Sequence, residues 1–153
     1  MGLIDDLKKR ISEFYANLDG GIYVQNIIWD NEAYIVDMNA EVQLNDQGVN
    51  NLGVEISDYE PYSEMTIEIK EAKGQPTDHV TLHDEGDFAA SFFIQANDKM
   101  FEIKASDFKT EELIKKYGRQ ILGLTTENIE ELIWKYIYPE LIDRRNSLCY
   151  GKD

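Results

Sequence analysis

Residues 91–104 read Ser-Phe-Phe-Ile-Gln-Ala-Asn-Asp-Lys-Met-Phe-Glu-Ile-Lys, and this stretch decides the fold class. Two runs rich in aromatic and branched side chains, 91–96 and 99–104, flank the pair Asn97-Asp98. Such side chains favour strands, and two turn-forming residues between two such runs are typical of a β-hairpin. We therefore predict an antiparallel hairpin in the middle of the chain, with its turn at Asn97-Asp98.

The residues before this hairpin continue the β region. Val80-Thr81-Leu82 predicts a short strand, and Asp84-Glu85-Gly86-Asp87 predicts a turn. Upstream of them, residues 73–77 contain Gly74 and Pro76 and indicate a loop. The small sheet is thus expected within residues 80–104.

Helical patterns lie on both sides of the β region. Apolar residues recur at helical spacing over residues 3–18, and Asp19-Gly20-Gly21 ends that helix. Downstream, we predict one helix from Lys109 to Tyr117, stopped by Gly118. A last helix is expected to be capped by Thr126 and kinked at Pro139.

Two segments allow both helix and strand. Residues 34–44 alternate apolar and polar as a strand does, but residues 39–44 have the composition of a helix, so we favour a helix over 31–45. Residues 64–72 fit a short helix or a strand, with Ser63 as the N-cap of the helix. Between them, residues 46–63 indicate a long loop.

Taken together, these patterns predict an α+β fold with N-terminal helices, a small antiparallel sheet and C-terminal helices. The 153 residues have the length of one domain, so we expect a single domain over 1–153. Cys149 is the one cysteine and cannot form an internal disulfide, which fits a reducing compartment. Because no histidine lies near it, we interpret Cys149 as a bystander on a terminal helix rather than a reactive thiol.

The acidic residues are distributed unevenly. The formal net charge is −15, and from Ile11 to Ile69 there are twelve acids and no lysine or arginine. The rest of the chain is nearly balanced, with 18 acids and 15 bases. Such a surface repels nucleic acid and anionic membranes and attracts basic partners. A solubilising surface is the simplest interpretation, but a base-free run of 59 residues is longer than solubility requires.

Two short patterns are similar to the metal sites of many nucleases. Asp58 precedes Glu68-Ile69-Lys70, and Asp87 precedes Glu102-Ile103-Lys104. In such sites the acids hold Mg²⁺ and the lysine positions the attacking water. The second pattern is the better candidate, because Glu102 and Lys104 would share one face of a strand. Strands also carry Glu and Lys on solvated faces, however, and a groove for DNA should be basic.

The two histidines do not form a convincing metal site. His79 and His83 lie near Asp84 and Asp87, but i and i+4 of an extended segment are about 13 Å apart, too far for one ion. The sequence contains no phosphate-binding glycine loop, nucleophile elbow or cysteine pair. We therefore predict no catalytic, cofactor-binding or metal-binding residues and no cofactor.

Tyrosine and tryptophan are frequent. Their rings are apolar with a polar edge, which suits protein interfaces as well as cores. The residues in question are Tyr15, Tyr23, Trp29, Tyr34, Tyr59, Tyr62, Tyr117, Trp134, Tyr136 and Tyr138.

The stretch from Tyr59 to Phe92 resembles phage tail-completion and virion-morphogenesis proteins. These families often place an aromatic residue and a proline before a Thr-x-x-x-Lys segment, here Tyr59-Glu60-Pro61-Tyr62 before Thr66 and Lys70. A loop follows, and then a Thr-Gly-x-hydrophobic-x-x-Ser signature that leads into a hairpin. Gly86, Phe88 and Ser91 match this signature, and Glu85 departs from it at the threonine. Residues 117–125 also resemble uncharacterised proteins of Bacteroidetes phages and prophages.

The resemblance implies a non-enzymatic particle component, a head–tail connector or neck protein. It implies an oligomeric ring that contacts other phage head, neck and tail proteins, with no membrane contact and no sequence-specific binding of nucleic acid. The protein would be made in the bacterial host cytoplasm and end in the virion. It also makes Gly86 a turn glycine. A negatively charged channel would fit this role, because DNA slides through it without sticking.

The sequence is compatible with three hypotheses for the function, which we rank as follows. The first is the ring-forming neck or tail-completion protein. The second is an inhibitor that mimics DNA through its acidic half, of the anti-restriction or anti-CRISPR kind, which would bind a basic host nuclease in a salt-sensitive way. The third is the metal-dependent nuclease built on Asp87, Glu102 and Lys104.

Overall fold

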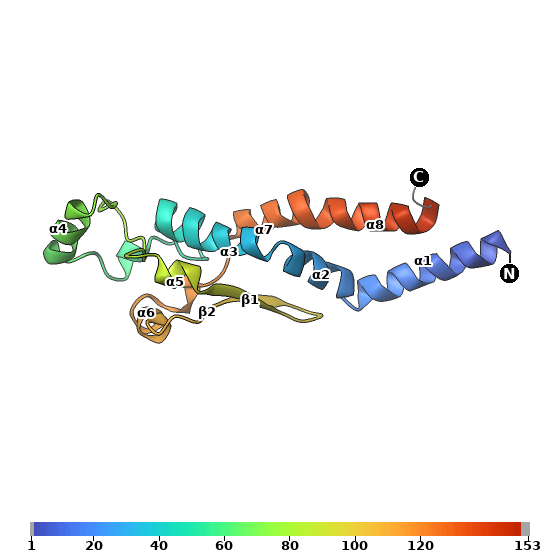
Figure 1. Cartoon of the computed structure of the whole chain (residues 1–153), viewed down its shortest axis with the longest axis horizontal. Coiled ribbons are helices and arrows are strands. Elements are labelled where there is room, and N and C mark those ends of the chain that lie inside the picture. The colour runs from blue at the N-terminus through green and yellow to red at the C-terminus, as the bar shows by residue number, and fades with distance from the viewer. Residues whose placement is uncertain (1, 151–153) are drawn as a thin grey trace.

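The computed structural model describes residues 2–150, and the molecule is elongated (Figure 1). Helix α4 (Glu64–Ala72) lies at one end. At the other end α1 (Leu3–Asp19) and α8 (Tyr138–Tyr150) lie side by side. The hairpin and the remaining helices form the body between them, which confirms the predicted α+β class with helices on both sides of a small sheet.

The elements between these ends follow the predicted order of helices, hairpin and helices. They are α2 (Ile22–Asp30), α3 (Glu32–Asp37), the π-helix η1 (Met38–Gln47), the 3₁₀ turn η2 (Ile56–Asp58), α5 (Asp87–Ala90), β1 (Phe92–Ala96), β2 (Phe101–Ala105), α6 (Thr110–Tyr117), the 3₁₀ turn η3 (Arg119–Ile121), α7 (Thr126–Leu132) and the π-helix η4 (Ile133–Ile137).

Strands β1 and β2 form the predicted antiparallel hairpin, with Ile94 opposite Ile103 on the buried face. The turn is longer than predicted, because Asn97 begins the loop instead of occupying its centre. The Asn97 side-chain oxygen accepts hydrogen bonds from the backbone N–H groups of Lys99 and Met100, at 2.9 and 3.0 Å. The Asn97 N–H in turn donates to the Met100 carbonyl at 2.9 Å, so the loop spans four residues.

The predicted strand at Val80-Thr81-Leu82 is wrong. The segment pairs with no strand, because side chains take its backbone groups: the Thr81 N–H donates to the Tyr62 hydroxyl at 3.0 Å. Leu82 has a φ of +54°, which turns the chain where a strand would continue. The sheet therefore covers 92–105 and not 80–104, and the predicted turn at 84–87 runs from Gly86 (φ +91°) into α5.

The segments that the sequence left ambiguous are both helical. Residues 31–45 fall in α3 and η1, as favoured, although η1 is a π-helix. Residues 64–72 form α4, and the Ser63 hydroxyl accepts a hydrogen bond from the Thr66 N–H, as an N-cap does. The predicted loop 46–63 is shorter than expected, because η1 extends to Gln47 and η2 forms within it.

In the C-terminal third, α6 ends at Gly118 as predicted, and the helix over 126–150 is continuous (Figure 1). Its cap is Thr125 and not Thr126, since the Thr125 hydroxyl accepts from the Asn128 N–H at 3.3 Å. The wide turn η4 stands directly before Pro139. Proline lacks an N–H and crowds the carbonyl four residues earlier, here Lys135, which a wider turn accommodates.

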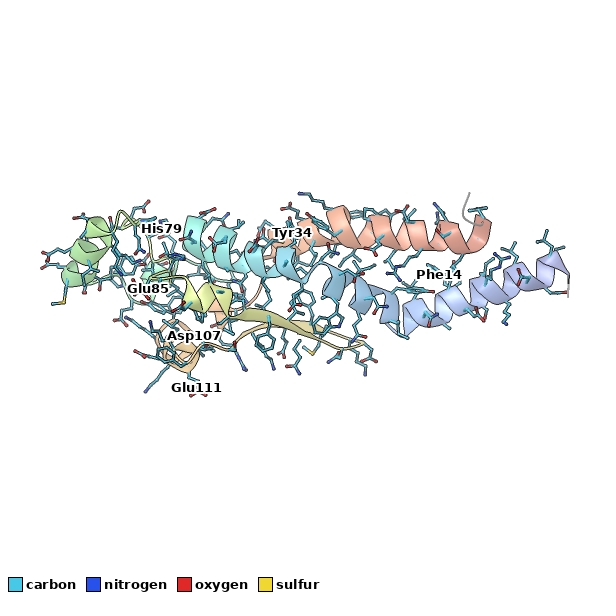
Figure 2. All side chains as sticks on the ribbon, in the orientation of Figure 1. Phe14, Tyr34, His79, Glu85, Asp107 and Glu111 are labelled. Atoms are coloured by element: carbon cyan, nitrogen blue, oxygen red, sulfur yellow. The ribbon has the colours of Figure 1, made fainter. Side chains whose placement is uncertain are left out.

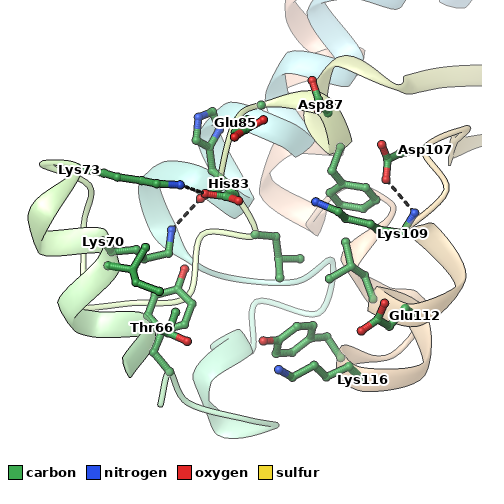
Figure 3. A pocket seen from close by; sticks show the side chains of 18 residues that line it. Thr66, Lys70, Lys73, His83, Glu85, Asp87, Asp107, Lys109, Glu112 and Lys116 are labelled. Carbon is green, nitrogen blue, oxygen red and sulfur yellow. Dashed lines mark hydrogen bonds and ion pairs between the residues drawn. The ribbon is translucent and has the colours of Figure 1, made fainter. Parts of the chain in front are cut away.

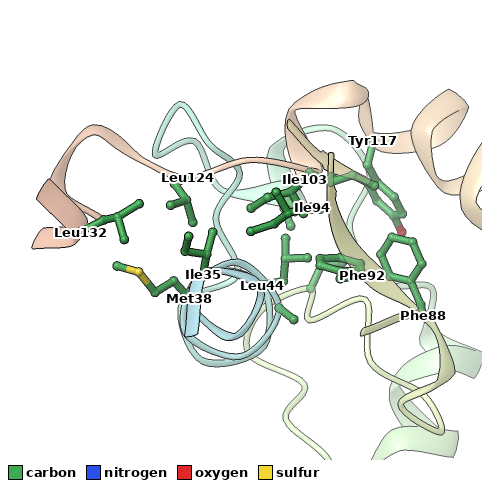
Figure 4. Close-up of a cluster of buried hydrophobic side chains, with 14 of the residues drawn as sticks. Ile35, Met38, Leu44, Phe88, Phe92, Ile94, Ile103, Tyr117, Leu124 and Leu132 are labelled. Atoms are coloured by element: carbon green, nitrogen blue, oxygen red, sulfur yellow. The ribbon is translucent and has the colours of Figure 1, made fainter. Parts of the chain in front are cut away.

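One cluster of buried side chains joins the hairpin to the helices (Figure 4). The cluster contains Ile35 of α3, Leu44 of η1, Ile94 and Ile103 of the hairpin and Leu132 of α7, so these elements share one core. Each fully buried Ile or Leu side chain contributes about 1.5–3 kcal/mol. Figure 2 shows Phe14 at the other end of the molecule, where it is the one residue of α1 that is buried.

Two fully buried amides, Asn39 and Gln43 of η1, hold the segment before α7. Asn39 donates to the Ile121 carbonyl at 3.0 Å and accepts from the Gly123 N–H at 2.9 Å. Gln43 donates to the Gly123 carbonyl at 2.9 Å and accepts from the Thr125 N–H at 2.8 Å. The two side chains thus replace the partner strand that this extended segment lacks.

A search of the helices within residues 2–150 finds none long and apolar enough to cross a membrane.

Candidate functional site

In the folded protein, the surface without exposed bases reaches further along the chain than the base-free run Ile11–Ile69 of the sequence. Lys70 is the first base after Arg10, but it is 7% exposed, and its ammonium group points into the molecule. The next base, Lys73, is exposed and forms an ion pair with Asp84. Between Ile11 and Ala72, the folded chain therefore presents no exposed lysine or arginine.

The acids at the α4 end of this surface point outward. Glu64, Glu68 and Glu71 are all exposed, and their spacing of four and three residues places them on one side of the helix. None of the three forms an ion pair with another residue of 2–150. We call these three residues the acidic tip.

Lys70 is inside because the loop after α4 supplies neutral acceptors. Its ammonium donates to the His83 carbonyl at 2.6 Å and to the Gln75 side-chain oxygen at 3.1 Å. It also lies 5.1 Å from the centre of the Tyr62 ring, in a cation–π contact. No carboxylate of the described residues pairs with this buried ammonium. Lys70 therefore fixes the loop 75–83 against α4.

A groove of about 540 Å³ opens beside Lys70 (Figure 3). All of its lining residues belong to two segments, 62–88 and 107–117. The buried Phe88 and Tyr117 line it together with lysines and acids from both segments. Phe108, which is 86% exposed, lies in the sequence between the lining residues Asp107 and Lys109.

Two of the lysines that line the groove, Lys73 and Lys116, are held in ion pairs. Lys73 bonds to Asp84, and this hydrogen bond raises the pKa of Lys73 and lowers the pKa of Asp84. Lys116 lies 3.2 Å from Glu60. Partial burial lowers the pKa of Lys116, but its hydrogen bonds to Glu60 and Tyr117 outweigh that effect and leave the pKa raised. An apolar surface with fixed charges around it suits recognition of a protein segment.

The structure does not gather the residues of the better nuclease pattern. Glu102 and Lys104 do share the solvent face of β2, as predicted, with 3.6 Å between carboxylate and ammonium. Asp87 lines the groove, and neither Glu102 nor Lys104 does. Within residues 2–150, no group of three or more His, Cys, Asp or Glu side chains is arranged to hold a metal ion.

The first nuclease pattern separates in the same way. Glu68 and Lys70 are two residues apart on helix α4, where such positions point to different sides. Glu68 is exposed and Lys70 is buried. Asp58 lies in η2, outside the lining of the groove.

The two histidines have separate surroundings. His79 packs against Gly48, and its Nε2 donates to the Asn45 carbonyl at 2.6 Å, which ties the loop 75–83 to the end of η1. His83 lines the groove, and its Nδ1 is buried without a hydrogen-bond partner among the described residues. Cys149 is partly exposed near the end of α8.

Several structurally important residues gave no clear signal in the sequence. The inward orientation of Lys70 depends on Gln75 and His83, which follow it in a loop. Asn39 and Gln43 are polar residues of a helix whose partners lie about 80 residues further along the chain. The spacing of four residues between them, on a segment predicted as helix, was the one available hint that they share a face.

The chain matches no protein-family model, and no curated protein or solved structure matches it either.

Proposed function

We propose that this protein is a non-enzymatic component of a phage particle, of the neck or tail-completion type, which assembles by protein contacts around the DNA channel. In this role the acidic tip faces the DNA. The groove and the exposed rings contact protein neighbours, and the protein is carried in the virion after synthesis in the host cytoplasm.

The observation that carries the proposal is the surface without exposed bases from Ile11 to Ala72. Duplex DNA has one phosphate charge for about every 1.7 Å of its axis, so exposed lysines in a channel would hold the duplex in place. Here the first lysine of the α4 end is turned inward, and the glutamates of the acidic tip are turned outward. Such a surface lets the duplex slide.

The surroundings of the groove support the second half of the proposal. Met65 and Ile69 of α4 are exposed on one side, and Phe108 is exposed on the other. Exposed apolar and aromatic side chains close to an apolar groove are typical of protein interfaces. The segment Tyr59–Phe92, which carries the resemblance to the phage families, forms one side of this groove.

The composition of purified particles tests the proposal. Mass spectrometry of gradient-purified virions from an induced lysogen should detect the protein at a constant small number of copies per particle. Deletion of its gene should leave filled heads without functional tails, and expression of the protein in trans should restore infectivity.

The DNA-mimic inhibitor predicts a different result in the same lysate. The protein would be absent from particles and would co-purify with a basic host nuclease, in a complex that dissociates as salt is raised. That result would replace the proposed function with the inhibitor.

A further inference from the structure

The hairpin has one protected edge and one free edge. On the outer edge of β1, the Ile94 N–H donates to the Glu32 carboxylate at 2.9 Å. On the same edge, the Ala96 carbonyl accepts a hydrogen bond from the Gln25 side-chain amide at 3.3 Å. Glu32 and Gln25 belong to α3 and α2, which pack closely against β1, whereas no described helix packs as closely against β2. Side chains of these two helices therefore take the place of a further strand beside β1.

The ladder of the hairpin determines which backbone groups of β2 point outward. Antiparallel strands alternate between opposite residues that exchange hydrogen bonds and opposite residues whose N–H and C=O groups point away from each other. Ile94 and Ile103 form a pair of the second kind, because the Ile94 N–H points to Glu32. The N–H and C=O groups of Ile103 therefore point outward, as do those of Phe101 and Ala105, two residues to either side. None of these groups forms a hydrogen bond with another described residue.

Strand β2 is the outer strand of the sheet, along one side of the body (Figure 1). Ile103 is 6% exposed, against 2% for Ile94 opposite. Ala105 is half-buried, whereas Phe92 opposite is buried. β2 contains no proline, and its one-to-one register with β1 includes no bulge. Prolines and bulges are common protections of strand edges, because unpaired backbone groups bind further strands. The edge of β2 is therefore able to accept a strand.

We propose that β2 of one copy pairs with β2 of a second copy, antiparallel about a two-fold axis at Ile103. In this register Ile103 lies opposite Ile103 of the second copy, and Phe101 lies opposite Ala105. All of the outward groups then face each other, and about six hydrogen bonds join the two hairpins into one sheet.

The charged side chains of β2 identify a second copy as the occupant. Glu102 and Lys104 lie on the solvent face of β2, and the proposed register places Glu102 directly opposite Lys104 of the second copy. The two-fold axis repeats this pair, so two cross-strand pairs of opposite charge form. They lie between the hydrogen-bonded pairs, where opposite side chains are closest.

Other registers of the same two strands are unfavourable. A slide by two residues places Glu102 opposite Glu102 or Lys104 opposite Lys104, and like charges at opposite positions repel. A slide by one residue turns outward groups of one strand toward inward groups of the other and exchanges the two faces of the sheet. The sequence Phe-Glu-Ile-Lys-Ala of β2 is thus complementary to itself in a single register.

This contact goes beyond the proposed function. A two-fold contact closes on itself at two copies, so it does not generate a ring, and the contacts of the proposed ring involve other surfaces.

Charge exchange within β2 tests the contact. Glu102→Lys and Lys104→Glu are made as separate variants, and each would place like charges opposite each other in the dimer. The matched controls are Glu130→Lys and Lys8→Glu, which make the same charge changes at exposed residues outside the hairpin without an ion pair to a described residue. Circular dichroism and thermal unfolding report whether each variant folds.

Sedimentation and light scattering of the full chain measure association from roughly 1 μM to 1 mM. Physiological ionic strength screens the repulsion between two chains of net charge −15. Wild type and controls should form the same dimer, and each β2 variant should associate roughly tenfold more weakly or worse. An equimolar mixture of the two β2 variants should form a heterodimer, because opposite charges again face each other. A chain with both exchanges should regain the wild-type dimer.

Disulfide trapping tests the register. On a Cys149→Ser background, Glu102→Cys mixed with Lys104→Cys brings the two thiols to opposite positions, where the Cα atoms are about 4.5 Å apart and a disulfide can form. Glu102→Cys alone places the two thiols on a diagonal with Cα atoms roughly 8 Å apart, beyond the reach of a disulfide. Under mild oxidation the mixture should give the cross-linked dimer, and Glu102→Cys alone should stay unlinked.

Four outcomes would overturn the contact. These are a wild-type monomer over the whole concentration range, a folded β2 charge variant that dimerises like wild type, a mixture of the two charge variants that stays monomeric, and cross-linking of Glu102→Cys alone as fast as the mixture. The contact and the proposed function fail separately. A dimer that passes these tests and is absent from particles keeps the contact and loses the phage role, and a protein found in particles that fails them keeps the role alone.

Discussion

The close approach of the hairpin loop to the break between α1 and α2 depends on a single glycine. A Cβ at Gly21 would overlap the carbonyl oxygen of Asp98, and Gly21 has a φ of +72°, which L side chains rarely adopt. Gly53 has the same φ, and a Cβ there would meet no atom within 4 Å. Both positions share the cost of a left-handed backbone, and only Gly21 adds the cost of overlap with a neighbour. Substitution of the two glycines therefore distinguishes these two costs.

We expect Gly21→Ala to lower the free energy of unfolding by roughly 3 kcal/mol, because it adds an overlap to the left-handed backbone. Gly53→Ala should lower it by about 1 kcal/mol, since only the backbone is strained. Urea denaturation of both variants measures the difference. Equal losses would mean that the hairpin loop does not pack against Gly21.

The buried Gln43 side chain gives a second test at this scale. Gln43→Ala would leave the Thr125 N–H and the Gly123 carbonyl without their buried partner, at a cost of about 3 kcal/mol. Asn45→Ala on the same helix removes only an exposed hydrogen bond to Glu41 and should cost less than about 0.5 kcal/mol. Thermal unfolding of the two variants compares them, and a tolerated Gln43→Ala would contradict the role of the amide.

Among the elements, the helices were predictable where local signals mark their ends. Ser63, Gly118 and the Gly20-Gly21 pair act through the backbone beside them, so their effects can be predicted from a short window of sequence. The segment 80–82 resembled a strand because its side chains are β-formers. It is held instead by a hydrogen bond from the Thr81 N–H to the Tyr62 hydroxyl. Tyr62 lies 19 residues earlier, so no pattern within the segment predicts this partner.

The candidate site was less predictable than the elements, for a related reason. The base-free run was visible in the sequence, but its extension to Ala72 depends on the buried position of Lys70. That position depends on the path of the loop 75–83, which has no periodicity. The groove combines residues 62–88 with 107–117, two segments that are separated in the chain by the hairpin.

The start of α7 allows a test of the cap that the structure assigns. Thr125→Ala removes the hydroxyl that accepts from the Asn128 N–H and should lower stability by about 1 kcal/mol. Thr126→Ala, one residue later, should change stability by less than about 0.5 kcal/mol, since Thr126 is exposed. Chemical denaturation of both variants decides which threonine is the cap.

The loop between α4 and α5 should open in acid through the Lys73–Asp84 pair. The ion pair lowers the pKa of Asp84 in the folded protein. The stabilisation by this carboxylate is therefore present above the pKa of Asp in the unfolded chain, about 3.9, and is lost as the pH falls below that value. Lys73 has a raised pKa, so its contribution is present at neutral pH and is lost only in strong base.

Hydrogen exchange of residues 75–86 in wild type should therefore accelerate, relative to the intrinsic rate, between pH 5 and pH 3. In Asp84→Asn this acid-induced change should be absent. The hairpin provides the internal control, because it contains neither residue. An identical acid response in wild type and Asp84→Asn would show that the pair does not hold the loop.

At the scale of the whole molecule, the acidic tip lies far from the two terminal helices. Helix α4, which carries the acidic tip, lies at one end, and α1 and α8 lie at the other with five bases and six acids between them. A contact made through α1 and α8 would therefore leave the acidic tip unobstructed.

Reversal of the acidic tip should affect DNA passage and not assembly. Glu64→Lys, Glu68→Lys and Glu71→Lys together would place three cations beside the duplex, and we expect infectivity to fall by roughly tenfold or more while particle number is unchanged. The same reversal at the exposed Glu111, Glu127 and Glu130 is the matched control. Plaque titre divided by particle count measures both variants.

Electron cryomicroscopy of purified virions, with the protein located in the density, tests the central claim most directly. The account predicts a ring at the neck or tail end in which α4 faces the lumen, with Glu64, Glu68 and Glu71 toward the DNA. A ring with α4 on its outer surface, or particles that lack the protein, would contradict it.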